Sequence, residues 1–211
     1  MNPIYKPEIF EVESEPAAKA IILTPEGSTT DERWAKETPY LIEDICSFIK
    51  PDQDTKVVDF GCGIGRISKE LIAKSGCAVL GLDISQSMLE LAVGYVSSPR
   101  FRPVTRPYLK NMIHNDMRVD ACVSLWVLQH CPKPLEEIAL IKSILKDDGY
   151  FYILNNIHSA IPTNMGWVSD GVDIQRALEN NFKLESYSQL PAELTTEHLS
   201  NASFIGKFRK H

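Results

Sequence analysis

The sequence predicts an α/β fold in which a single doubly wound, mostly parallel sheet carries helices on both faces. Three observations support this. Short apolar segments alternate with helical patterns between residues 56 and 156, as repeated βαβ units require. The first apolar segment, VVDF at 57–60, runs into a glycine-rich turn and then into a helical pattern. The last two apolar segments are joined by a loop rather than a helix, which predicts an antiparallel pair at one edge.

Composition and charge narrow the class of protein. The chain has 211 residues, 44% of them hydrophobic and 24% charged, which suits one well-cored domain. Its net charge of −6 disfavours non-specific binding to nucleic acid, because that binding needs a basic surface. No apolar stretch approaches the roughly 18 residues of a membrane span, and the N-terminus lacks a signal pattern. We therefore expect a cytoplasmic protein without nucleic-acid or membrane partners; its oligomeric state is not predicted.

The cysteines and histidines give no metal or disulfide pattern. Five cysteines include no C-x-x-C pair, which indicates reduced, mostly buried thiols. The five histidines show no ligand spacing with them, so we expect no metal site.

The N-terminal part is expected to lie outside the core. Residues 1–27 contain four prolines and one short apolar run, which favours an irregular N-terminal flap. The remaining residues, 28–211, then form one domain with lid helices at 28–50 and a core at 55–211.

The lid region reads as two helical pieces. Thr29 and Glu32 fit a capping box, and Pro39 is expected to interrupt the helix and start a second one. The second piece has one apolar face, formed by Leu41, Ile42, Ile45, Phe48 and Ile49.

The core elements follow in order. Strands are predicted at 56–60, 77–83, 100–105, 119–127, 150–156, 182–190 and 203–210. Helices are predicted at 65–76, 85–98, 134–149 and 172–181.

A glycine-rich turn marks the candidate site. Gly61, Gly63 and Gly65 form a G-x-G-x-G run between the first strand and its helix, where ligands of such sheets bind. A dinucleotide fingerprint would need its last glycine where Arg66 stands. That difference disfavours a nicotinamide-dependent oxidoreductase, which stays open as an alternative.

The second strand ends in a carboxylate. Asp83 lies 22 residues after Gly61, at the place where an acidic side chain can accept hydrogen bonds from both hydroxyls of a ribose. The alternative is a packing turn beside a solvent-facing aspartate. The two features together favour a nucleoside ligand.

The sequence resembles the class I S-adenosylmethionine (SAM)-dependent methyltransferases. The segments that carry the resemblance, in order along residues 30–190, are VVDFGCGIGR, GLDISQSMLELA, VDACVSLWVLQHCPKPLEEI and LKDDGYFYILN. The resemblance implies a Rossmann-like, seven-stranded sheet with an antiparallel last strand and an N-terminal helical lid. It also implies SAM as the cofactor and S-adenosylhomocysteine (SAH) as its product.

The resemblance implies roles for residues beside the methionine part of SAM. Gly61, Cys62 and Gly63 would contact it through the backbone, with Gly65 in the same turn. Asp59 would hold its amino group, directly or through water.

The resemblance also assigns the rest of the cofactor. Asp83 would bind the ribose, Ile84 would pack on the adenine, and Leu125 and Trp126 would line the pocket near the sulfonium. The adenine amino group has no clear partner, since the family's usual aspartate is missing and only Asn111 or Asp116 is near that place in the sequence.

Three residues near the lid have two possible roles. The ring of Trp34 could steady the sulfonium cation or simply anchor its helix in the core. Arg33 and Arg66 could meet the SAM carboxylate or lie as surface charges.

His130 is the candidate for the chemistry. It follows the fourth strand and would act as a general base, position the acceptor, or only pack. The N/D-P-P-Y/F motif of amino-methylating nucleic-acid enzymes is absent after that strand, which leaves a small-molecule or protein-terminus acceptor. We therefore predict methyl transfer by in-line displacement, most simply to a small molecule. A catalytically silent SAM-binding module is the other alternative.

Overall fold

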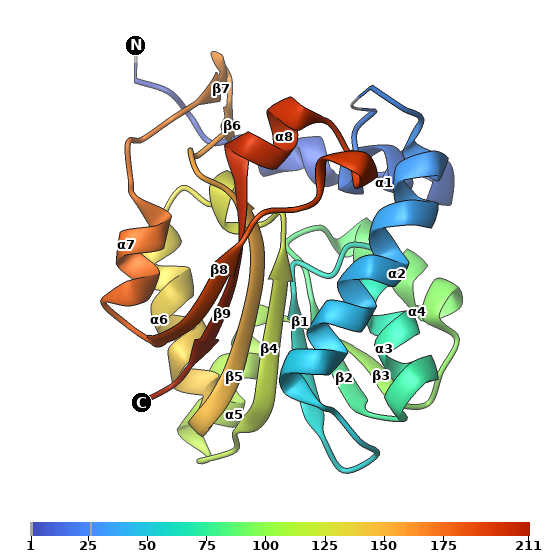
Figure 1. The fold of residues 1–211 in the computed structure, drawn as a ribbon, viewed down its shortest axis with the longest axis vertical. Helices are drawn as coiled ribbons and strands as arrows, with labels where there is room; N and C mark the ends of the chain where they lie inside the picture. Colours follow the sequence, from blue (N-terminus) through green and yellow to red (C-terminus); the bar gives the residue numbers. More distant parts are fainter. Residues whose placement is uncertain (1, 26) are drawn as a thin grey trace.

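A seven-stranded sheet forms the centre of the molecule, with helices on both of its faces (Figure 1). The computed structural model describes residues 2–25 and 27–211. Across the sheet the strands are β3 (Phe101–Val104), β2 (Ala78–Leu82), β1 (Lys56–Phe60), β4 (Val119–Leu125), β5 (Leu145–Asn156), β9 (Ser203–Arg209) and β8 (Lys183–Ser188). The last strand, β9, runs opposite to the other six strands of this sheet. The predicted mostly parallel sheet with an antiparallel last strand is therefore confirmed.

Two layers of helices cover the sheet. On one face lie α2 (Thr30–Ile49), α3 (Arg66–Ser75) and α4 (Gln86–Val96), and on the other lie α5 (Arg106–His114), α6 (Pro134–Ile144) and α7 (Ile174–Glu179). Successive strand residues point to opposite faces of the sheet. Val57 packs in the core beneath α2, α3 and α4, and Val58 packs in the core beneath α5, α6 and α7; both are fully buried. Burial on both faces explains why the central strands β1 and β4 are mostly apolar.

The lid region forms one helix instead of two. The Thr29–Glu32 capping box starts α2 as predicted, but the helix continues through Pro39 to Ile49. Proline inside a helix removes one backbone hydrogen bond and crowds the carbonyl four residues earlier, which costs about 3 kcal/mol. The same buried face runs from Arg33 before the proline to Leu41 after it, so packing against the core outweighs that loss.

Several short elements were not predicted, because too few residues carry their pattern. These are α5 and the hairpin of β6 (Ile161–Thr163) and β7 (Gly166–Val168). The connection between β8 and β9, expected to be a loop, also contains the short helices η3 (Ala192–Leu194) and α8 (Glu197–Ala202). The helix expected to reach residue 149 ends at Ile144, where β5 begins.

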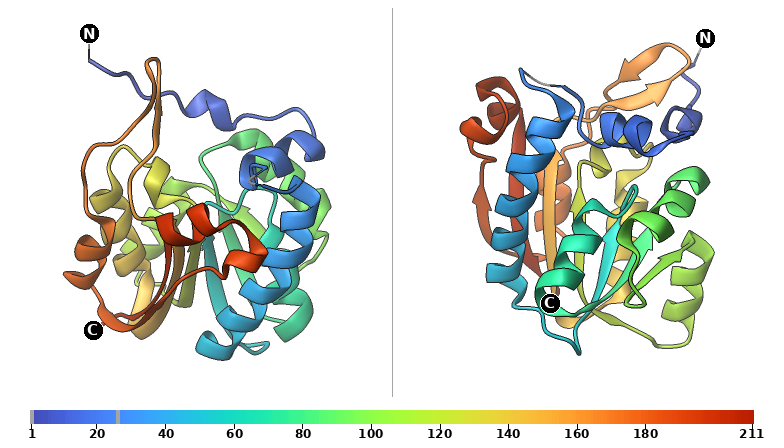
Figure 2. Two further views of the ribbon diagram at one scale, coloured as in Figure 1. Left: turned by 45° about the horizontal axis from the view of Figure 1, so that its top comes forward. Right: turned by 90° about the vertical axis from the view of Figure 1, so that its right-hand side faces the viewer.

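The N-terminal segment is more regular than expected. It contains η1 (Pro7–Phe10) and α1 (Glu15–Ile22), and Ser14 caps α1. The backbone N–H of Lys6 donates to the Pro162 carbonyl at 3.0 Å, which adds the segment to the β6–β7 hairpin. Figure 2 shows the two together above the carboxyl ends of the parallel strands. We call residues 4–25 and 161–168 the cap.

Glu11 fastens the cap to the core. Its carboxylate accepts a hydrogen bond from the Ser87 hydroxyl at 2.6 Å and another from the Ser85 hydroxyl at 3.1 Å. It also accepts from the backbone N–H of Ser87, in the first turn of α4. The first turn of a helix leaves backbone N–H groups without partners inside the helix, so a carboxylate is favoured beside the first turn of α4.

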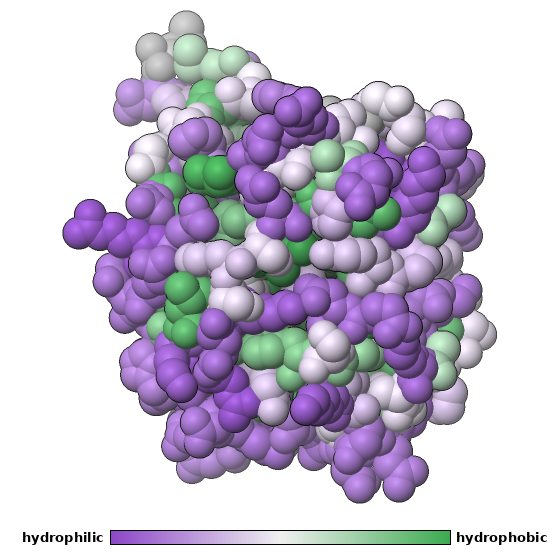
Figure 3. All heavy atoms as spheres, viewed as in Figure 1, coloured by the Kyte–Doolittle hydropathy of each residue, from purple (hydrophilic) through white to green (hydrophobic). Residues whose placement is uncertain are grey.

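The surface is mostly polar on the face seen in Figure 1, where hydrophobic residues form small, separate patches (Figure 3). Among the described residues, no helix is both long and apolar enough to cross a membrane.

Candidate active site

A cavity of about 640 Å³ lies between the carboxyl ends of the strands and the cap. This volume is typical of a pocket for a small molecule. The core contributes Gly61, Gly63 and Asp83 to its wall, and the cap contributes Phe10 and Trp167. The cavity therefore joins the predicted nucleoside site to a second, aromatic region.

The glycine turn needs glycine for two reasons. Gly61 and Gly63 have φ angles of +79° and +54°, a conformation that side chains disfavour. A Cβ at Gly63 would also lie 2.5 Å from Cδ1 of Ile22 on α1, and one at Gly61 would lie 2.2 Å from a methyl of Val127. The backbone of the turn therefore lies on the cavity wall, and the side chains of Ile22 and Val127 pack directly against it.

Three residues expected at the methionine end do not line the cavity. Asp59 is buried beneath the turn, where it accepts a 2.6 Å hydrogen bond from Ser68 and where burial raises its pKa to about 6. The Cys62 side chain points into the core, and Gly65 begins α3 with a φ of +84°. Contact between SAM and any of the three stays a prediction.

Asp83 and Ile84 stand together on the cavity wall. The Asp83 carboxylate accepts from the backbone N–H of Gly63 at 2.8 Å and of Ser85 at 3.0 Å, and burial raises its pKa. Ile84 leaves 61% of its surface exposed. An exposed aliphatic side chain beside a carboxylate suits a ribose joined to a flat base.

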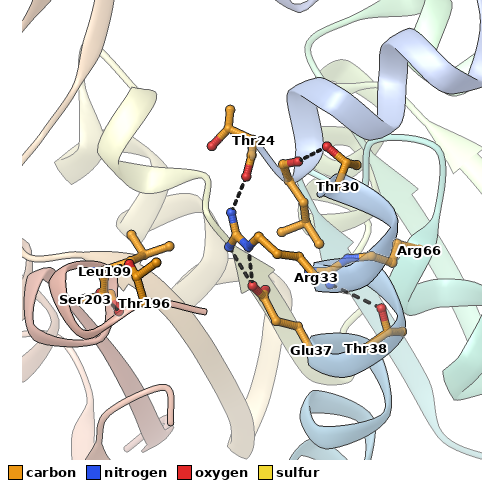
Figure 4. A network of polar contacts seen from close by, with 10 residues as sticks. Thr24, Thr30, Arg33, Glu37, Thr38, Arg66, Thr196, Leu199 and Ser203 are labelled. Carbon is orange, nitrogen blue, oxygen red and sulfur yellow. Dashed lines mark hydrogen bonds and ion pairs between the residues drawn. The ribbon is translucent and has the colours of Figure 1, made fainter. Parts of the chain in front are cut away.

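A buried charge network connects α2, α3 and the cap (Figure 4). Arg33 is 2% exposed and donates to Glu37 through Nε at 2.6 Å and to the Thr24 carbonyl through Nη1 at 2.6 Å. Arg66 is also buried and donates to Thr38, and desolvation lowers its pKa to about 10. The possibility that these arginines lie as surface charges is therefore wrong. Arg33 also lines the cavity.

Trp34 is not one of the described residues that line the cavity. Its ring packs edge-on against Tyr95, with centroids 6.2 Å apart, and the cations of Lys19 and Arg66 lie 5.5 and 5.4 Å from it. The anchoring role is the one that this geometry favours. Leu125 and Trp126 do line the cavity, and their contact with the sulfonium stays a prediction.

His130 lies in the aromatic region, in a short turn after β4. Its Nδ1 is 2.7 Å from the Ala160 carbonyl oxygen. A carbonyl can only accept, so Nδ1 carries the hydrogen. In the neutral ring Nε2 keeps its lone pair, 3.4 Å from the side-chain nitrogen of Gln129. Burial lowers the pKa of His130. Phe10 and Trp167 of the cap flank the ring, with centroids 5.7 and 5.3 Å away.

Comparison of the sequence and of the fold with known proteins indicates the family of this domain. Residues 58–153 match the model of the family described as a methyltransferase domain. A TehB-like SAM-dependent methyltransferase from Corynebacterium glutamicum has the same fold, with a TM-score of 0.58 and 25% identity over 82% of this chain and 87% of the other. Residues 58–153 therefore carry a methyltransferase domain, and the fold is that of the class I SAM-dependent methyltransferases.

Two sequence relatives of this chain are similar over part of their length. A mitochondrial ubiquinone biosynthesis O-methyltransferase from Dictyostelium discoideum is 26% identical over 61% of this chain and 47% of its own. A ubiquinone biosynthesis O-methyltransferase from Haemophilus ducreyi is 30% identical over 67% of this chain and 61% of its own. This chain therefore spans less than two thirds of either relative.

The cavity fits SAM, the cofactor that the methyltransferase domain implies. The glycine turn leaves backbone exposed at the cavity wall, and Asp83 places a carboxylate beside the apolar Ile84. Arg33 also lines the cavity, but its guanidinium is paired with Glu37, so its contact with the SAM carboxylate stays a prediction. Among the described residues, no group of three or more His, Cys, Asp or Glu side chains is placed to hold a metal ion, and all five cysteines are free.

The sequence missed several residues of the methyltransferase cavity. Phe10 and Trp167 line it from the cap, and Arg106 and Glu137 line it from α5 and α6. Asn111 and Asp116, the two candidates for the adenine amino group, are not among the described residues that line the cavity. No local pattern marks the cap residues, because the two segments meet only in the folded chain.

We expect Asp83→Ala to weaken SAM binding by about 1.5–3 kcal/mol, since hydrogen bonds from the ribose to a charged acceptor are lost. Calorimetric titration with SAM measures the change, and the loop variant Asp54→Ala, which is exposed, is the matched control. A folded Asp83→Ala protein with unchanged affinity would remove the ribose assignment.

Proposed function

We propose that this protein transfers a methyl group from SAM to a hydroxyl oxygen of a small, uncharged aromatic molecule. The observation that carries the proposal is His130, a half-buried imidazole whose pKa burial lowers and which lines the same cavity as the glycine turn and Asp83. SAM supplies a methyl group that is already activated, so the chain mainly has to align the acceptor and exclude water.

His130 is proposed to receive the proton. A hydroxyl is a weak nucleophile until its proton is removed, and Nε2 of His130 holds a lone pair for that proton. The Ala160 carbonyl keeps the ring in this tautomer through Nδ1. Phe10 and Trp167 would contact the flat faces of the acceptor and keep water from it.

Two further observations support the acceptor class. The arginines on the described cavity wall are each paired with a glutamate, Arg33 with Glu37 and Arg106 with Glu137, which disfavours an anionic acceptor. The two relatives described above are named O-methyltransferases, which supports oxygen as the receiving atom.

The test is a methyl-transfer assay with a panel of small acceptors. The protein is incubated with SAM and with phenols, catechols or hydroquinones, and in parallel with their methyl ethers and with aromatic carboxylic acids. Mass spectrometry detects SAH and the methylated product. We expect turnover only with free hydroxyls. Binding of SAM without turnover on any hydroxyl compound would instead favour a silent SAM-binding module.

A further inference from the structure

An ion pair of unassigned role lies on the cavity wall beside the nucleoside site. Arg106 on α5 donates through Nη1 to Oε2 of Glu137 on α6, and both residues line the cavity. The Glu137 side chain is only 15% exposed. Its second carboxylate oxygen accepts no hydrogen bond from the part of the chain that the structure describes.

The sheet places this pair next to Asp83. Strands β2 and β3 are parallel neighbours, with Leu82 opposite Val104. Asp83 follows β2 directly, and Arg106 follows β3 by two residues, so both stand at the same edge of the sheet. The cap closes over this end through Tyr5: burial raises the Tyr5 pKa to about 12, and the negative charges of Glu137 and Asp83 add to the rise.

We infer that Glu137 recognises the amino group of the cofactor's adenine and that Arg106 positions Glu137 for this contact. The inference rests on the proposed placement of the ribose at Asp83. The glycine turn follows β1 and Asp83 follows β2, so a base attached to that ribose extends toward β3 and meets Arg106 and Glu137.

The chemistry of the base explains why a carboxylate is useful there. The adenine amino group donates hydrogen bonds, and a free carboxylate oxygen accepts one. Hypoxanthine carries a carbonyl oxygen in place of that amino group, which would set one acceptor against another. Glu137 therefore selects adenine over hypoxanthine, and it does so from α6 rather than from the loop after β3.

The experiment compares two demethylated cofactors. Isothermal titration measures the binding of SAH and of S-inosylhomocysteine, which differ only in the base. We expect the unmodified protein to prefer SAH by roughly 10- to 100-fold, since one charge-assisted hydrogen bond is replaced by a repulsive contact. Glu137→Gln should reduce this preference to about threefold or less, because an amide presents either a donor or an acceptor. Arg106→Gln should reduce it in the same direction.

The controls separate this inference from the proposed function. Glu136→Gln removes the same charge one residue earlier, where the carboxylate pairs with Lys133 and faces solvent, and should keep the full preference. Asp83→Ala should weaken both ligands equally. Equal affinity of the unmodified protein for both ligands, or an unchanged preference in Glu137→Gln, overturns the inference while leaving methyl transfer intact. If the unmodified protein binds neither ligand, the placement of the nucleoside fails as well.

Discussion

His130→Ala is expected to slow methyl transfer roughly 10²–10⁴-fold at neutral pH while leaving SAM affinity nearly unchanged. The variant removes the lone pair that would take the hydroxyl proton, but the glycine turn and Asp83 stay in place. Steady-state rates with the best acceptor of the panel, together with calorimetric SAM binding, measure the two effects separately. The exposed His158→Ala is the matched control and should behave as the unmodified protein.

The pH dependence of the two proteins should differ. Burial lowers the His130 pKa from its ordinary value of 6.5, so the ring is neutral at pH 7 and the base is present. The rate of the unmodified protein should then fall only in acid, as the pH drops through that lowered pKa. The His130→Ala rate should instead rise toward pH 10, where a phenol ionises without help. Equal rates of the two proteins at every pH would show that His130 only packs.

Gly63→Val should abolish SAM binding while leaving most of the fold. At a φ of +54° a β-branched side chain is strained, and its Cβ would meet Ile22 at 2.5 Å. The side chain must then enter the cavity or displace α1, and either change removes the surface that the methionine part of SAM would contact. Titration with SAH and a circular dichroism spectrum report binding and fold separately.

Two companion variants show which cause dominates in Gly63→Val. Gly94→Val adds the same side chain at a glycine with open space around it and should bind SAH normally. Ile22→Ala combined with Gly63→Val removes the clash with α1. Recovery of binding in the double variant would assign the loss to α1, whereas continued loss would assign it to the turn. Normal SAH binding by Gly63→Val itself would mean that the turn serves packing alone.

The structural features that could be predicted from the sequence are those specified by residues close together in the chain. A capping box, a left-handed glycine and an apolar strand are each specified within a few residues, so the central sheet, α3 and the Gly61–Asp83 pair were predictable. Pro39 was misjudged because helix-breaking is local, whereas the buried face that keeps α2 continuous is tertiary. Arg33 looked like a surface charge because Glu37 and the Thr24 carbonyl become its partners only after folding.

The two halves of the cavity differ in how freely they can change in evolution. The donor half is made of strand ends and the glycine turn, whose residues also hold the core together. The aromatic half is made of side chains at the chain's beginning and on a short hairpin, both outside the repeated βαβ units. We therefore expect substitution of Phe10 or Trp167 to alter acceptor preference with little loss of core stability. Related chains could diversify their acceptors through these two segments, and the same positions are the natural targets for a designed library.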